Sequence, residues 1–191
     1  MAMAGKKSSD KELKQTIQNH IDKTHYVKVF FSEECPEEFT SGFILNVSEN
    51  FLMIQESHNF TLDGIKIIPY NRIEGTRHKK FEKTSEKIFS EEGLIKFNQK
   101  IISNTSLKNF ESLFKSLKKQ NFHCIVESST KKKNIFSIGE ILEINEKSVV
   151  IKNYDATGKI EKTPDRILFE NINFITFNDL YSLTFRKYLI E

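Results

Sequence analysis

The sequence predicts a mainly β fold with helices, arranged as two tandem small β-barrels that are each preceded by an amphipathic helix. The first observation is a repeat, because the pattern at 42–54 recurs at 139–151 and both copies begin with Gly-x-Ile-Leu. The second is the alternation of short β-branched and aromatic runs with turn residues around each copy. The third is length, because 191 residues are enough for two domains of roughly 90 residues each.

The first half is predicted to begin with a helix at 10–23, in which apolar residues recur at a spacing of four. Strands follow, and Gly42 within the second strand marks the bend that a short sheet needs in order to curl. The dipeptide Asp63-Gly64 is the predicted hairpin turn before the fourth strand. The strands of this half are predicted at 26–31, 39–47, 51–57, 65–70 and 72–76.

A connecting segment is predicted between the halves. Residues 81–104 carry apolar residues at helical spacings, and Gly93 interrupts them. We therefore expect short helical pieces there. The predicted organisation is a disordered tail at 1–9, a first barrel at 10–90, a connecting segment at 91–104 and a second barrel at 105–191.

The second half repeats the order of the first. A helix is predicted over 107–117, with Ser106 as its cap, and 180–189 is predicted as a short strand or a terminal helix. The spacing that takes Gly42 to Gly139 also takes other apolar positions of the first half onto apolar positions of the second, which indicates an internal duplication. The strands of this half are predicted at 122–127, 135–145, 148–154, 159–163, 166–170 and 173–177.

Each half has a Gly-x-Ile strand that follows a helix and a first strand and precedes further short strands, with Gly42 and Ile44 in one copy and Gly139 and Ile141 in the other. This order resembles the Sm-like fold, the small SH3-like barrel of Sm, LSm and Hfq proteins. The resemblance implies binding of single-stranded RNA and assembly of subunits through paired edge strands. In a tandem chain, the two halves could pair in this way internally and leave one free edge at each end, which a homo-oligomer would satisfy.

The positions that contact RNA in that family differ in this chain. The family holds a uracil base with an asparagine of its first motif and with the arginine of an Ile-Arg-Gly motif. Leu52 and Val149 stand at the asparagine position. The second motif is replaced by Ile73-Glu-Gly75 in one half and by Ile172-Asn-Phe174 in the other. The sequence therefore predicts the scaffold without the uridine pocket.

Charge and cysteine content set further bounds. The formal net charge is +3, from 29 basic and 26 acidic residues, which is too balanced to indicate a nucleic-acid-binding protein by itself. Cys35 and Cys124 form no metal-binding motif, and a reduced cytoplasmic setting is the simple interpretation. The N-terminus lacks the apolar run of a signal peptide, and no stretch approaches the ~18 apolar residues of a membrane span.

No catalytic residue, metal site or cofactor is predicted. None of the histidines pairs with another histidine, cysteine or carboxylate at the spacing of a known metal motif. Phosphate-binding glycine loops, nucleophile elbows and paired-carboxylate motifs are missing as well. We therefore expect a protein that is not an enzyme. The five histidines are His20, His25, His58, His78 and His123.

Two basic clusters are the candidate contacts to nucleic acid. They could bind phosphates, or they could be solvated loops that keep the protein in solution. The expected function is a non-catalytic binding module that binds RNA. The alternative is a protein-interaction or scaffolding module that assembles through barrel edge strands, with itself or with another protein. The candidate residues are Arg72, Arg77, Lys79 and Lys80 in the first half and Lys131, Lys132 and Lys133 in the second.

Overall fold

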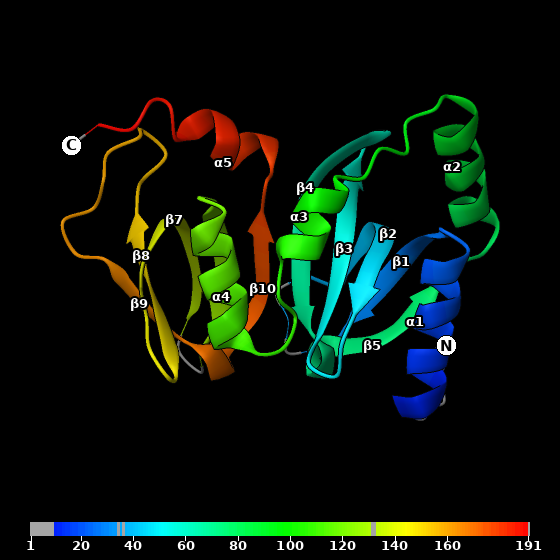
Figure 1. The fold of residues 1–191 in the computed structure, drawn as a ribbon, viewed down its shortest axis with the longest axis horizontal. Coiled ribbons are helices and arrows are strands. Elements are labelled where there is room, and N and C mark those ends of the chain that lie inside the picture. The colour runs from blue at the N-terminus through cyan, green and yellow to red at the C-terminus, as the bar shows by residue number, and fades with distance from the viewer. Residues whose placement is uncertain (1–9, 34, 36, 131–132, 191) are drawn as a thin grey trace.

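The computed structural model describes residues 10–33, 35, 37–130 and 133–190. Across these residues, ten strands form one antiparallel sheet, and five α-helices lie around it (Figure 1). The mainly β class with helices is confirmed. The sheet is open from its first strand to its last, so two closed barrels are not confirmed. The tail predicted at 1–9 lies outside the described residues.

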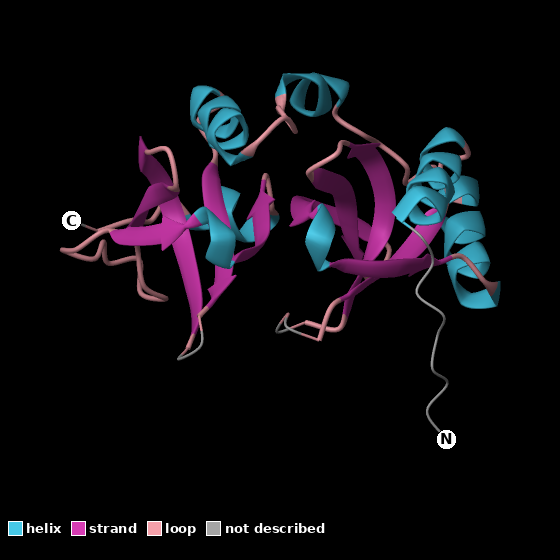
Figure 2. Cartoon of the chain, turned by 90° about the horizontal axis from the view of Figure 1, so that it is seen from below, coloured by secondary structure: helices cyan, strands magenta, loops and turns pink. Residues whose placement is uncertain are grey.

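The strands form two curved lobes with helices around their outside (Figure 2). The first lobe contains, in chain order, α1 (Asp10–Asp22), β1 (Tyr26–Phe31), β2 (Phe39–Val47), β3 (Phe51–His58), β4 (Thr61–Pro69), the short 3-10 helix η1 (Tyr70–Arg72) and β5 (Ile73–Arg77), followed by α2 (Lys80–Glu91). The segment predicted as a connection carries α3 (Gln99–Asn104). The second lobe contains α4 (Phe110–Lys119), β6 (His123–Ser129), β7 (Asn134–Ile144), β8 (Ser148–Asn153), β9 (Asp165–Leu168), η2 (Phe169–Asn171), β10 (Ile172–Phe177) and α5 (Leu180–Phe185).

The strand order of one lobe repeats in the other. The sheet runs β5-β1-β2-β3-β4-β10-β6-β7-β8-β9, so the last strand of each lobe lies beside its first strand, and the next three follow in sequence. Within the described residues, no helix is both long and apolar enough to cross a membrane.

The repeated glycine lies at the same close approach in both lobes. A Cβ atom on Gly42 would lie 1.9 Å from the carbonyl oxygen of Gln55 on β3, and one on Gly139 would lie 2.0 Å from that of Lys152 on β8. The β2–β3 and β7–β8 pairings each shift register shortly after this glycine. A bulge bends and twists the strand that carries it. The motif therefore marks the bend of the second strand in each lobe, as the sequence predicts.

The two lobes join through β4 and β10. Ile67 pairs with Ile175 and Ile65 with Phe177, and all four side chains are buried. The larger hydrophobic core also crosses this junction, because Phe51 of β3 belongs to the same cluster as residues of α4, β6 and β8. The internal edge pairing that the resemblance suggests is thus present in the fold. The larger core is common to both lobes, and a second core lies in the first lobe with Phe174 of β10.

The hairpin between β3 and β4 turns earlier than predicted. Asn59 and Phe60 connect these strands, and both have positive φ, 47° and 62°. Positive φ at both central residues is what a tight two-residue hairpin requires. The predicted turn, Asp63-Gly64, instead lies inside β4, where the side-chain amide of Gln55 donates to the Gly64 carbonyl at 2.6 Å. The Asp-Gly prediction was wrong because such a pair also fits an irregular point within a strand.

Two predictions for the second lobe also differ from the structure. The helix begins at Phe110, and the Asn109 side chain accepts from the Ser112 N–H at 2.8 Å, so Asn109 rather than Ser106 is the cap. Residues 159–163 form no ladder strand, only isolated bridges at Lys159 and Ile160. The proline at position 164, which has no N–H to donate, directly follows that segment.

Candidate interaction surfaces

Arg77, one of the predicted RNA-contact residues, forms an ion pair within the protein. Its Nε and Nη2 donate to one carboxylate oxygen of Glu82 at 3.1 and 2.8 Å. Burial would raise the pKa of Glu82, but hydrogen bonds from Arg77 and from the Lys79 N–H outweigh it and hold that pKa below its usual range. This pair anchors the start of α2 to the end of β5, which gives Arg77 a structural role.

The other described candidates do not gather in one place. Arg72 is half-buried, and its Nη2 donates to the Glu170 carbonyl of the other lobe at 3.4 Å. Lys79 and Lys80 are exposed where α2 begins, at the outer side of the first lobe (Figure 1). Lys133 is exposed between β6 and β7 in the second lobe. Lys131 and Lys132 lie outside the described residues.

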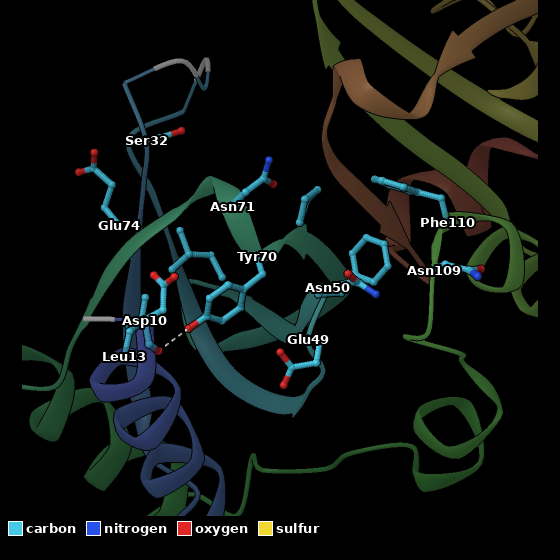
Figure 3. A pocket seen from close by; sticks show the side chains of 13 residues that line it. Asp10, Leu13, Ser32, Glu49, Asn50, Tyr70, Asn71, Glu74, Asn109 and Phe110 are labelled. Carbon is cyan, nitrogen blue, oxygen red and sulfur yellow. Dashed lines mark hydrogen bonds between the residues drawn. The ribbon is translucent and has the colours of Figure 1, made fainter. Parts of the chain in front are cut away.

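A cleft of about 660 Å³ lies where the two lobes meet (Figure 3). The β2–β3 turn, η1 and the start of α1 form one side, and the start of α4 closes the other. Two hydrogen bonds connect the β2–β3 turn to the segment that precedes α4. The Ser48 hydroxyl donates to the Leu107 carbonyl at 2.7 Å, and the Asn50 amide donates to the Lys108 carbonyl at 2.6 Å. The lining residues are Asp10, Leu13, Ser32, Glu49, Asn50, Phe51, Pro69, Tyr70, Asn71, Ile73, Glu74, Asn109 and Phe110.

The cleft is acidic. Asp10, Glu49 and Glu74 line it, and none of the described residues that line it is a lysine or an arginine. The Tyr70 hydroxyl donates to the Asp10 carbonyl at 3.4 Å, and the two groups face each other in Figure 3. Burial raises the pKa of this tyrosine, and the charges of Asp10 and Glu49 raise it further. Lys14 pairs with Glu49 beside the cleft and offsets one of these charges. The remaining carboxylates, Asp10 and Glu74, repel phosphate groups.

This cleft lies at the turns where the Sm-like resemblance would place a uracil base. Leu52, at the family's asparagine position, is fully buried and carries no group that could bind a base. Glu74, at the arginine position, is exposed and lines the cleft as a carboxylate. Neither position therefore carries the base-binding group that the resemblance implies, and Glu74 adds a negative charge to the cleft.

The sheet ends in two strands that each have one neighbour. Within the described part of the chain, β5 pairs with β1 alone and β9 pairs with β8 alone. The Phe169 N–H donates to the Lys147 carbonyl at 2.9 Å in continuation of the β8–β9 register. Backbone groups in an antiparallel pair alternate between facing the partner and facing away. The N–H of Arg166 therefore faces away from β8, toward the open side.

Sequence reasoning missed two groupings that the fold creates. The cleft combines turns of the first lobe with Asn109 and Phe110 of the second, and no local pattern signals that meeting. Three histidines from separate segments, His20, His25 and His78, also come together beside β5.

Comparisons with protein-family models, with curated proteins and with solved structures find no match to this chain.

Proposed function

We propose that this chain is a non-catalytic protein-interaction module made of two Sm-like units, and that it assembles with further copies of itself through its edge strands. The observation that carries the proposal is the β4–β10 junction, where the two lobes pair edge strands within one chain. The same kind of pairing, made between chains, would use the two strands that have one neighbour each, β5 and β9.

The repeat predicts the register of such an interface. β9 occupies in the second lobe the place of β4 in the first, and β5 occupies the place of β10. Ile67 and Ile175 face each other across the internal junction. Arg166 takes the position of Ile67, because Met53 of β3 and Val150 of β8 are equivalent and pair with them. Thr76 takes the position of Ile175, because Val29 of β1 and Val126 of β6 are equivalent and pair with them. Arg166 of one copy would therefore exchange backbone hydrogen bonds with Thr76 of the next.

Head-to-tail pairing of two different edges is heterologous, so it produces a ring or a filament rather than a two-fold dimer. Both edges also carry features that limit indiscriminate pairing. β9 is four residues long and contains Asp165 and Arg166, while β5 carries Glu74. Short, charged edges resist aggregation, so the interface we propose is selective.

RNA binding has weaker support than self-assembly. The described basic residues are dispersed or paired, and the cleft at the position expected for a nucleotide is acidic. Filter binding with single-stranded RNA at low salt, where phosphate contacts are strongest, is the discriminating measurement. Binding that is abolished when Lys131, Lys132 and Lys133 are changed to Glu would favour RNA as the natural partner.

The proposal is tested by the mass of the full chain in solution. We expect light scattering after size exclusion to give a mass that is a multiple of 22.3 kDa. Arg166→Pro removes an outward N–H at an edge, where proline is tolerated, and should give a monomer. Arg166→Ala keeps that N–H and should still assemble. A wild-type chain that is monomeric at every concentration would contradict the proposal.

A further inference from the structure

Three imidazoles converge beside β5. His20 lies in the last turn of α1, His25 lies just before β1, and His78 directly follows β5. One ring nitrogen from each lies within 4.8 Å of those of the other two. The Nδ1 atoms of His20 and His25 are 3.0 Å apart, and the rings of His25 and His78 stack with centroids 3.9 Å apart.

The backbone fixes this convergence. The His25 N–H donates to the His20 carbonyl at 3.0 Å across the turn that contains Thr24, whose φ is +52°. Lys28 of β1 pairs with Arg77 of β5, which brings His78 to the same corner from 53 residues further along the chain than His25. His20 is therefore held on a helix, and His25 and His78 lie directly at the ends of two paired strands.

Two of the rings are oriented by hydrogen bonds on their other nitrogen. His78 Nε2 lies 2.9 Å from a carboxylate oxygen of Glu86, and the same oxygen accepts from the Tyr26 N–H at 2.9 Å. His20 Nε2 lies 3.2 Å from the Thr76 hydroxyl. A carboxylate or hydroxyl behind an imidazole is the usual arrangement around metal-bound histidines, because it fixes the tautomer and orients the ring. The Nδ1 of His20 then faces that of His25, and His78 uses its Nε2 for Glu86, so its Nδ1 is the other donor atom of that ring.

The electrostatics favour neutral rings at His20 and His25. Burial, together with the neighbouring His25 and His78 and against Glu86, lowers the pKa of His20 to about 4. Burial also lowers the pKa of His25, and His78, Lys23 and Lys83 act in the same direction against Glu86. A neutral imidazole offers a lone pair to a metal ion, whereas a protonated one does not. At neutral pH, His20 and His25 therefore present nitrogen donors near the Glu86 carboxylate.

We propose that His20, His25 and His78 bind one divalent transition-metal ion of the zinc class, with Glu86 and Thr76 holding two of the rings. Imidazole nitrogens suit zinc, which binds them at about 2.0–2.1 Å in a tetrahedron, so that two ligand atoms lie about 3.3 Å apart. The 3.0 Å spacing of the two Nδ1 atoms is close to that value. His20 is buried, while His25 and His78 are partly exposed, which leaves the fourth position open toward the surface.

Such an ion would join α1, β1 and the segment that follows β5 at one point. This inference does not rest on the proposed assembly, because all five residues come from one lobe and each contact lies within one chain. The rival explanation is a hydrogen-bonded cluster of neutral histidines that binds no ion, and the same titration distinguishes the two.

The test is a zinc titration of the full chain after chelator treatment and dialysis, followed by calorimetry. We expect one Zn²⁺ per chain and a rise in melting temperature on binding. His25→Ala should weaken binding at least tenfold, and Glu86→Gln, which keeps all three imidazoles, should weaken it by ~10–100-fold. His58→Ala is the matched control, because His58 is exposed at the end of β3 and outside the cluster.

A direct readout guards against misfolded variants. Circular dichroism shows whether His25→Ala keeps its strands, and X-ray absorption of the zinc-loaded wild type should show about three imidazole nitrogens at ~2.0–2.1 Å. A chain that takes up no Zn²⁺, or a folded His25→Ala variant that binds it as tightly as wild type, would overturn the proposal.

Discussion

The two lobes have the same strand order and the same glycine-dependent bend. They differ in the side chains at the position of the histidine cluster, beside the last strand of each lobe. The spacing that takes Gly42 to Gly139 takes His20 to Leu117 and His25 to Phe122. The strand registers place His78 at the position of Phe177, because Arg77 and Thr176 pair with the equivalent residues Lys28 and Ile125. Three imidazoles in the first lobe thus correspond to a leucine and two phenylalanines in the second.

This difference shows which features the fold itself requires. In the second lobe, Leu117 is fully buried and the Phe122 ring packs 5.2 Å from that of Phe177, so apolar packing is enough to close the corner. The first lobe instead closes it with His20 and a hydrogen-bonded carboxylate, Glu86. Since the scaffold does not need polar groups here, their presence in one lobe alone points to a role beyond folding.

The largest effect should come from the glycine that the lobes share. Gly42→Ala and Gly139→Ala each place a Cβ about 2 Å from a backbone carbonyl oxygen, which forces the paired strands apart. We expect each to reduce the free energy of unfolding by more than ~3 kcal/mol, with similar values for both. Urea denaturation of the two variants measures this.

Gly75→Ala is the control for that pair. A Cβ there would meet no described atom within 4 Å, so the expected cost is below ~1 kcal/mol. If Gly139→Ala were tolerated while Gly42→Ala unfolds the chain, the two bends would not be equivalent, and the comparison of the lobes would lose its basis.

A smaller effect is expected at the internal junction. Lys66 on β4 is buried, with its ammonium 2.9 Å from Glu37 and 3.1 Å from Glu56. Burial would lower the pKa of Lys66, but the charges of Glu56 and Glu37 outweigh it and raise that pKa. Lys66→Ala leaves these carboxylates without their cation and should cost ~3 kcal/mol in urea denaturation.

The matched change at the open edge is Asp165→Ala, because Asp165 on β9 takes the place of Lys66 in the repeat. Asp165 is half-buried, and none of the ion pairs found among the described residues includes it. We expect a cost below ~1 kcal/mol. Equal costs at the two sites would show that the buried ion pairs do not distinguish the junction from the edge.

The smallest effect is a pH dependence of the free energy of unfolding that should arise from His20 in the first lobe. The pKa of His20 is about 4 in the folded chain and about 6.5 in the unfolded one, so the unfolded state binds more protons between these values. Stability should be complete above about pH 6.5 and should fall, by ~2 kcal/mol, as the pH drops toward 4. His20→Leu, which installs the residue of the second lobe, should remove this part of the slope in metal-free thermal melts. An unchanged slope would mean that His20 is not the titrating group.

Much of the fold could be predicted from the sequence, because each strand carries its own alternation. Gly42 and Gly139 indicated the bends, and the pattern repeat indicated the shared strand order. The β3–β4 turn at Asn59 and Phe60 was missed because neither residue is a strong turn signal beside the Asp-Gly pair that follows. The sequence could not show that the two lobes join into one open sheet, since this depends on which edge strands pair with each other rather than on local pattern.

The candidate sites were mostly hidden from the sequence. His20 and His25 lie five residues apart, which matches no metal motif, and His78 joins them only through the β1–β5 pairing. The basic residues were visible, but their partners were not, and Glu82 gives Arg77 a structural role. Long-range contacts of this kind become known only once the strand order is known.

The most direct test of the account is amide hydrogen exchange at the internal junction and at the two edges, measured over a range of protein concentrations. The amides of Ile67 and Ile175 should be protected at every concentration, because they pair within one chain. Those of Arg166 and Thr76 should become protected only as concentration rises and copies pair β9 with β5. Exchange at Arg166 and Thr76 that does not change with concentration would contradict assembly through these edges.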